Sequence, residues 1–415
     1  MELIPRKIAR DVLFSLQNSP VVFVNGPRQA GKSTLVQELA KNDFPAEYIT
    51  FDNTTQMAAA ASSPHTFLST RPHSVIIDEV QMVPDMFRAL KVVVDKLRAE
   101  DKATANGRFL LTGSANIMAL PKLSDPLVGR INVKTLYPFA VCETRKIESS
   151  FISRLFNGDF SNLKKTKFSL NQAIRVATYP EISGKKIRER TEWFDGYITT
   201  ILQRDVRMLS ELEKLAMLPT MLRVLAARAG SLMNDASIAR DVGLNPVTSK
   251  SYRGVLQAMF LTLDIQPWYR NIGKRLVKSP KGYLLDTLLL CHLLDVQLEG
   301  LREKRPELYG HIVENFVATE ITKLLSFSEF RANLYHLRTS DNKEVDFVLE
   351  RPDGSIVGVE VKSSDMVKAR DFQGLKVLAE SSAKDFVCGI ILYAGEDVIP
   401  FGENLFAVPF DALWS

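Results

Sequence analysis

Val21-Val22-Phe23-Val24-Asn25 runs directly into Gly26-Pro27-Arg28-Gln29-Ala30-Gly31-Lys32-Ser33-Thr34. The first segment has the apolar and β-branched composition of a buried strand, and the second matches the pattern G-x-x-x-x-G-K-[ST]. Glycine lets the backbone turn so that successive N–H groups point at one anion, and a helix that begins at Lys32 presents its positive end to the same anion. The stretch therefore predicts a strand, a phosphate-binding loop and a helix, in that order.

This loop predicts a site for ATP with Mg²⁺. Lys32 is expected to supply the cation for the β- and γ-phosphates, and the hydroxyl of Ser33 is expected to ligate Mg²⁺. The nucleotide contacts are predicted along the whole loop: Gly26, Pro27, Arg28, Gln29, Ala30, Gly31, Lys32, Ser33 and Thr34.

A second apolar segment, residues 74–77, ends in two acids, Asp78 and Glu79. We expect Asp78 to hold Mg²⁺ through water and Glu79 to polarise the attacking water as the catalytic base. A third apolar segment, residues 108–111, is followed by small polar residues that are candidates for sensing the γ-phosphate: Thr112, Ser114 and Asn116. The other interpretation of this third segment is a glycine-containing turn.

Length and composition predict several domains of an ordinary α/β protein. The chain has 415 residues, of which 46% are hydrophobic and 24% charged, and its net charge of +5 is too dilute to argue for nucleic acid by itself. Three widely spaced cysteines, no signal-like N-terminus and no long apolar run favour a cytoplasmic protein without membrane spans. We expect an ATPase domain at 1–148, a linker and helical region at 149–219, a winged-helix-like domain at 220–300 and an α/β domain at 301–415.

The region 220–300 predicts a helix-turn-helix. Ala239 and the turn glycine Gly243 have the required spacing, and a polar second helix follows. Four residues of that second helix are expected to face outward: Thr248, Ser249, Lys250 and Arg253. Four basic residues flank the expected wing: Lys274, Arg275, Lys278 and Lys281. The alternative is a helical packing module that links two domains.

The last expected domain carries carboxylates in a pattern that is typical of a metal site. Asp346 lies in one alternating segment, and Glu360 and Lys362 share one face of the next, across a Pro-Asp-Gly turn. Glu314 lies beside the apolar stripe of a helix at residues 311–325. Carboxylate oxygens favour Mg²⁺ or Mn²⁺, so Glu314, Asp346 and Glu360 are predicted ligands and Lys362 a predicted catalytic residue. The alternative is a β-hairpin with solvated charges.

The ordered motifs resemble a known family. GPRQAGKSTL is followed by IIDEVQ, LLTGSAN, LVGRI and LYPFAVCE, at residues 26–35, 76–81, 110–116, 127–131 and 136–143. Together they resemble the AAA+-type ATPases of bacteria and archaea that carry a C-terminal domain of unknown function, DUF4143-like. The set Asp346, Glu360 and Lys362 with the helical Glu314 resembles the PD-(D/E)XK nucleases. The resemblance implies an AAA+-like parallel sheet, a winged-helix middle and a restriction-nuclease-like end.

The resemblance leaves the arginine that contacts the γ-phosphate open between two residues. Arg130 is a candidate for sensing it in cis, and Arg204 is a candidate for acting in cis or in trans.

Two functions follow from the sequence. One is an ATP-driven enzyme that acts on DNA or RNA, with a metal-dependent nuclease domain. The other is a regulatory nucleotide switch that controls a protein–protein interface, with a protein partner or a second copy of the chain and a catalytically silent C-terminal domain.

Overall fold

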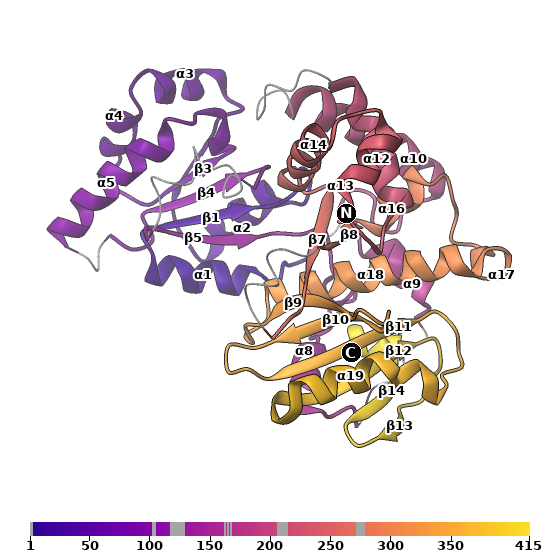
Figure 1. The fold of residues 1–415 in the computed structure, drawn as a ribbon. Helices are drawn as coiled ribbons and strands as arrows, with labels where there is room; N and C mark the ends of the chain where they lie inside the picture. Colours follow the sequence, from indigo (N-terminus) through magenta and orange to yellow (C-terminus); the bar gives the residue numbers. More distant parts are fainter. Residues whose placement is uncertain are drawn as a thin grey trace. The chain divides into compact units, whose positions relative to one another are not determined.

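The computed structural model describes residues 3–101, 105–116, 129–161, 163, 166, 168–205, 215–270 and 279–415 (Figure 1). The chain divides into two compact units. The first comprises Met1–Pro138 and Ala258–Phe260, and the second comprises Phe139–Gln257 and Leu261–Ser415.

The first unit contains a parallel sheet of five strands in the order β2-β3-β4-β1-β5. Its strands are β1 Val21–Asn25, β2 Glu47–Thr50, β3 Val75–Asp78, β4 Phe109–Gly113 and β5 Ile131–Thr135. Its helices are α1 Ala9–Asn18, α2 Lys32–Asn42, α3 Thr54–Ser62, α4 Pro64–Ser69 and α5 Met86–Glu100, with a 3₁₀ turn η1 at Val80–Met82. The strand predicted at Val21–Asn25 is confirmed, and β3 and β4 lie one or two residues from the apolar segments at 74–77 and 108–111.

The core of this unit follows from the alternation of side chains along the strands. Val21 and Phe23 of β1 belong to a buried cluster with residues of α3, α4 and α5, whereas α1 packs on β1 and β5. Because all five strands are parallel, their carboxyl ends meet at one edge of the sheet. Asn25, Asp78 and Gly113 therefore end their strands at the same edge.

The second unit is built on a sheet of nine strands in the order β13-β14-β12-β11-β10-β9-β7-β8-β6. The strands are β6 Ser231–Leu232, β7 Thr262–Pro267, β8 Lys281–Leu284, β9 Asn333–Arg338, β10 Glu344–Glu350, β11 Ile356–Lys362, β12 Phe386–Tyr393, β13 Ile399–Gly402 and β14 Leu405–Pro409. The helices are α7 Val141–Thr144, α8 Phe151–Asn157, α9 Leu170–Val176, α10 Ile187–Thr200, α12 Leu218–Ala227, α13 Asp235–Val242, α14 Pro246–Ala258, α16 Thr287–Leu293, α17 Leu301–Lys304, α18 Pro306–Ser326 and α19 Gln373–Ser382. A π-helix, η4 Ile201–Asp205, follows α10, and short 3₁₀ turns lie at Leu215–Met217, Ala369–Phe372, Ala383–Asp385 and Phe410–Leu413.

The parts predicted as a middle domain and a C-terminal domain share this sheet. Strand β7 pairs with β8 on one side and in parallel with β9 on the other, through Gln266↔Tyr335 and Pro267↔His336. The order α12, β6, α13, α14, β7, β8 is the one expected of a winged helix, and that assignment remains a prediction. The sheet contains strands from both sides of residue 300, and both sides belong to the same compact unit.

Helix α18 connects the two halves of this unit through buried polar side chains. Asn315 is fully buried; its Oδ1 accepts from the backbone N–H of Leu284 at 2.9 Å, and its Nδ2 donates to the Leu284 carbonyl at 3.1 Å. The same Nδ2 donates to Thr287 Oγ1 at 3.1 Å. The Asn315 side chain thus provides hydrogen-bond partners for the last residue of β8 and the first residue of α16.

We predict that Asn315→Ala destabilises the chain by about 2–4 kcal/mol, because it leaves the buried amide and carbonyl of Leu284 unpaired at about 1–3 kcal/mol each. Urea unfolding of the full chain measures the loss. The matched control is Asn157→Ala, at an exposed position of α8. Equal unfolding midpoints for the two variants would contradict the prediction.

Candidate functional site

The phosphate-binding loop has the backbone conformation that its sequence requires. Gly26 and Gly31 have φ of 144° and 94°, and Gln29 between them has φ of 62°. A Cβ on Gly26 would lie 2.1 Å from the carbonyl oxygen of Leu136, so no other residue fits there without moving that backbone. The loop is therefore held between β1 and the segment after β5.

Lys32 and Arg6 hold this loop from two sides. The Lys32 side chain is buried, and its ammonium donates to the carbonyls of Gly26 at 3.1 Å and Pro27 at 2.9 Å. Arg6 donates from Nη1 to the Ala30 carbonyl at 2.8 Å and from Nη2 to the Tyr137 carbonyl at 2.6 Å. Arg6 was not predicted from the sequence, because nothing local marks an arginine before the first strand as a partner of the loop.

Asp78 ends β3 as a buried carboxylate with two hydroxyl partners. Its Oδ2 accepts from the Tyr48 hydroxyl at 2.7 Å, and its Oδ1 accepts from Thr112 Oγ1. Burial, together with the hydrogen bond and the charge of Asp78, raises the pKa of Tyr48, which keeps the phenol a donor. A carboxylate at this edge, with the Ser33 hydroxyl at the start of α2, is a donor set that suits Mg²⁺.

Glu79 follows in a left-handed conformation with φ of 59°. Its N–H donates to Thr112 Oγ1 at 3.2 Å, and its carboxylate accepts from Gln81 Nε2. The same Gln81 nitrogen donates to Ser114 Oγ at 3.1 Å. Two of the predicted sensor residues, Thr112 and Ser114, thus belong to the hydrogen-bond network of the two acids.

The third sensor candidate, Asn116, lies on the other side of β4. Asn25 at the end of β1 donates from Nδ2 to Asn116 Oδ1 at 3.5 Å and accepts from Thr135 Oγ1 at 2.7 Å. The three candidates therefore all lie at the carboxyl edge of the sheet.

Of the two candidate arginines, the structure describes the side chain of Arg130, which lies away from the loop. Arg130 precedes β5 at the opposite edge of the sheet, one five-residue strand away, which corresponds to about 16 Å. Its guanidinium makes two hydrogen bonds to Asp95 of α5, at 2.6 Å and 2.9 Å. The side chain of Arg204 lies outside the described residues, although its backbone belongs to η4. The roles of both residues remain predictions.

The second unit brings three predicted metal ligands together around a lysine. Asp346 and Glu360 are neighbours on β10 and β11: the Asp346 N–H donates to Glu360 Oε2 at 3.3 Å, and Asp346 Oδ2 accepts from the Val361 N–H at 3.0 Å. Lys281 of β8 places its ammonium 3.0 Å from Asp346 Oδ1 and 3.2 Å from Glu314 Oε1. We call Lys281, Glu314, Glu344, Asp346 and Glu360 the carboxylate cluster.

Further contacts complete the carboxylate cluster. Glu344 Oε2 lies 3.9 Å from the Lys281 ammonium, and the Tyr283 hydroxyl donates to Glu314 Oε1 at 2.7 Å. Glu360 and Lys362 lie on one face of β11, as predicted from the period of a strand.

Burial and neighbouring charges shift the pKa values of the three predicted ligands in different directions. Burial and the neighbouring Asp346 raise the pKa of Glu314 to about 7 and that of Glu360 well above its ordinary value. Burial opposes ionisation of Asp346, but the charge of Lys281 and the hydrogen bonds that it receives lower its pKa below the usual range. Among the described residues, no group of three His, Cys, Asp or Glu side chains is arranged to hold a metal ion.

The structure corrects the expected basic surface of the winged-helix-like region. Ser249, Arg253 and Lys281 were expected to face outward, and all three are buried. Arg253 forms ion pairs with Asp235 and Asp264, because a buried guanidinium needs charged partners. Lys250 is exposed as expected, whereas Lys274, Arg275 and Lys278 lie outside the described residues.

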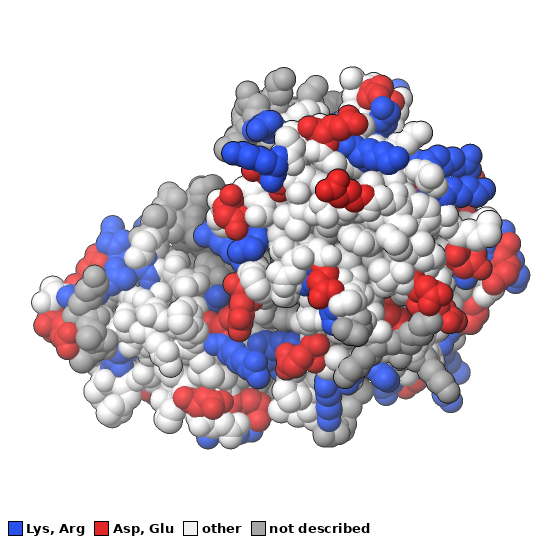
Figure 2. Space-filling model, turned by 90° about the horizontal axis from the view of Figure 1, so that it is seen from below, with Lys and Arg blue, Asp and Glu red and all other residues white. Residues whose placement is uncertain are grey.

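On the face drawn in Figure 2, lysine and arginine side chains are interspersed with acids. That face therefore does not carry the single-sign basic surface that electrostatic attraction of nucleic acid favours.

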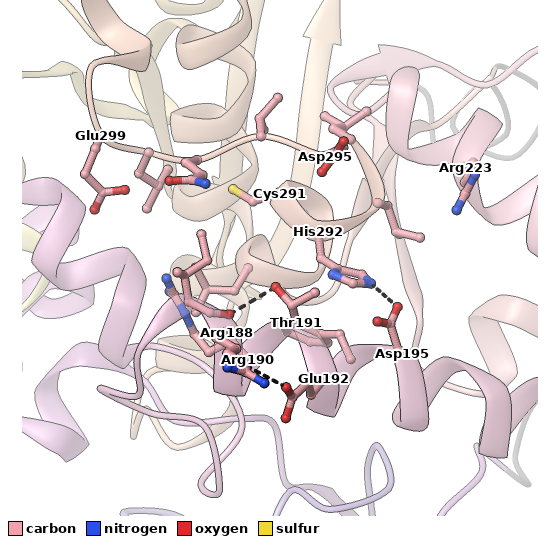
Figure 3. Close-up of a pocket in the computed structure, with 18 residues that line it drawn as sticks. Arg188, Arg190, Thr191, Glu192, Asp195, Arg223, Cys291, His292, Asp295 and Glu299 are labelled. Carbon is pink, nitrogen blue, oxygen red and sulfur yellow. Dashed lines mark hydrogen bonds and ion pairs between the residues drawn. The ribbon is translucent and has the colours of Figure 1, made fainter.

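A cavity of about 770 Å³ between α10 and the segment after α16 was not predicted from the sequence (Figure 3). Arg188, Arg190 and Arg223 line it together with acids that offset their charge. The Asp195 carboxylate lies 3.2 Å from His292 Nε2, and the thiol of Cys291, whose pKa burial raises to about 12, also lines the cavity. The balance of charge does not select one class of ligand.

Fold and loop together define a P-loop protein of the AAA class of ATPases. A family model described as "AAA domain" matches residues 18–145, one described as a domain of unknown function (DUF8612) matches 167–300, and another (DUF4143) matches 309–413. The chain belongs to the family of the uncharacterized proteins Rv2008c of Mycobacterium tuberculosis and Mb2031c of Mycobacterium bovis. It is 30% identical to each over 401 residues, which cover 96% of this chain and 82% of theirs.

Two solved structures are among those to which parts of this chain are similar. The Walker-type ATPase PABY2304 of Pyrococcus abyssi is 15% identical, with 70% of this chain and 96% of that chain covered and a TM-score of 0.43. The replication initiator DnaA, bound to AMPPCP and single-stranded DNA, is 18% identical, with 62% and 88% covered and a TM-score of 0.30. Within the described part of this chain, no helix combines the length and the apolar character that crossing a membrane demands.

We predict that Lys32→Ala weakens ATP binding severely, because the phosphates lose the ammonium that the loop supplies. Titration with a fluorescent ATP analogue measures the affinity. Lys41→Ala, an exposed lysine of the same helix, is the matched control and should bind like the wild type. Unchanged affinity in Lys32→Ala would remove this loop as the nucleotide site.

Proposed function

We propose that the chain binds ATP with Mg²⁺ at the loop Gly26–Thr34 and hydrolyses it. The observation that carries the proposal is the convergence of Lys32, Asp78 and Glu79 at one edge of a parallel sheet. In this proposal Lys32 leaves the carbonyls of Gly26 and Pro27 to bind the β- and γ-phosphates, whose charge is the stronger attraction.

Ser33 and Asp78 are the residues that would hold Mg²⁺, which neutralises charge on the phosphates when bound. Thr112 and Tyr48 orient the Asp78 carboxylate through their hydroxyls. Glu79 has the role of polarising the attacking water, and its bond to Gln81 fixes the carboxylate before the nucleotide arrives.

Two uses of this ATPase compete. The neighbouring Asp346 and Glu360, with Lys362 on the same strand face, support an enzyme that cuts nucleic acid with a divalent metal. The buried ion pairs of Lys281 and Arg253 support the other use, a nucleotide switch, because both cations are paired with acids of the protein and do not face a nucleic acid. We propose the second: a nucleotide switch whose C-terminal region is catalytically silent in this state and whose partner is a protein.

Measuring ATP hydrolysis with and without duplex DNA, single-stranded DNA and RNA tests this choice. The switch predicts the same turnover in all four reactions. Stimulation by one nucleic acid, with a dependence on salt, would replace it with the nucleic-acid enzyme.

We predict that Glu79→Gln retains ATP binding and hydrolyses ATP at least about a hundredfold more slowly, because general-base assistance contributes roughly 10²–10⁴ in rate. Phosphate release under saturating ATP measures turnover, and nucleotide titration confirms binding. Glu47→Gln, an exposed acid at the start of β2, is the control. Turnover of Glu79→Gln at the wild-type rate would exclude Glu79 as the base.

A further inference from the structure

Lys281 is fixed by the sheet on both sides. Its backbone pairs with Ile265 of β7 and with Leu232 of β6, and its side chain is only 3% exposed. On the same face of β8, Tyr283 is buried and bonds to Glu314. The pairing of β8 with β6 and β7 therefore positions the Lys281 ammonium in the carboxylate cluster.

The ammonium contacts two of the carboxylate oxygens that a metal would need. Mg²⁺ requires carboxylate oxygens at about 2.1 Å in a near-octahedral arrangement. The Lys281 nitrogen lies 3.0 Å from Asp346 Oδ1 and 3.2 Å from Glu314 Oε1, so it contacts both oxygens. A metal ion would have to displace the ammonium to bind these two oxygens. The predicted ligands therefore do not fit a bound metal in this arrangement.

We propose that Lys281 is the resident cation of the carboxylate cluster and excludes divalent metal from it. The proposal rests on the part of the proposed function that leaves the C-terminal region silent. Metal binding without nucleotide is measured independently of ATP hydrolysis, so failure of this proposal is distinguishable from failure of the ATPase.

Removing the ammonium should open the carboxylate cluster. Lys281→Met keeps the length of the side chain but leaves Glu314 and Asp346 without the ammonium that they share. Glu344 keeps its ion pair with Arg338 at 2.8 Å. Carboxylates that converge in this way attract a hard divalent ion, because the shared cation that offset their repulsion is gone. Lys281→Arg keeps a positive charge and should keep metal out.

Calorimetric titration of the nucleotide-free full chain with Mn²⁺ tests the proposal. The wild type should show no Mn²⁺ site that depends on Asp346. Lys281→Met should bind Mn²⁺ at least about tenfold more tightly than the wild type. The double variant Lys281→Met/Asp346→Asn should lose that gain. Mn²⁺ should also raise the thermal unfolding midpoint of Lys281→Met, because an ion that binds only the folded chain stabilises it.

Lys376→Met is the matched control, an exposed lysine of α19 that should leave Mn²⁺ binding unchanged. Wild-type binding of Mn²⁺ that Asp346→Asn abolishes would overturn the proposal, and so would a folded Lys281→Met without the gain. If Lys281→Met does not fold, a difference between the Mn²⁺ titrations of the wild type and Asp346→Asn would still overturn the proposal.

Discussion

The second unit depends on satisfying the buried polar side chains of α18. Glu314 pairs with Lys281 and Tyr283 of β8, and Asn315 bonds to the backbone of the same strand. Further along the helix, Glu320 accepts from the Val141 N–H, and Lys323 donates to the carbonyls of Phe139 and Ala177. Removing one partner of a buried pair costs about 3–5 kcal/mol, because the other charge stays desolvated. A single helix thereby fixes strand β8, the segment at residue 139 and the end of α9.

The first unit differs from the second because its proposed site must bind an anion. Parallel strands place their polar ends at one edge, where the glycines of the loop allow left-handed backbone that other residues resist. Hydroxyls of Tyr48 and Thr112 satisfy Asp78, and Arg6 ties the loop to Tyr137. The loop and its acids are thus held by hydrogen bonds in advance of any ligand, which reduces the entropy lost on binding.

The two units use lysine in opposite ways. Lys32 is held by two carbonyls, which are neutral acceptors that a phosphate can replace. Lys281 is held by carboxylates, which match its charge, and its backbone is paired on both sides. The first lysine is poised to exchange partners, whereas the second is already neutralised. This difference in partner charge, more than the motifs themselves, separates a site ready for a ligand from one that is closed.

Sequence alone determined the strand at Val21–Asn25, the loop after it and the alternation that places Glu360 and Lys362 on one strand face, because these follow from local backbone chemistry and short periods. Lys281 and Tyr283 are two residues apart in β8 and therefore share one strand face. This spacing was a signal for a buried lysine, but the other basic residues of the expected wing obscured it. Tertiary structure alone decided the partners of Lys281, Arg253 and Arg130. Whether a charged side chain is solvated or buried depends on acids far away in the chain, such as Asp346, Asp264 and Asp95, which only the packing of strands and helices brings within reach.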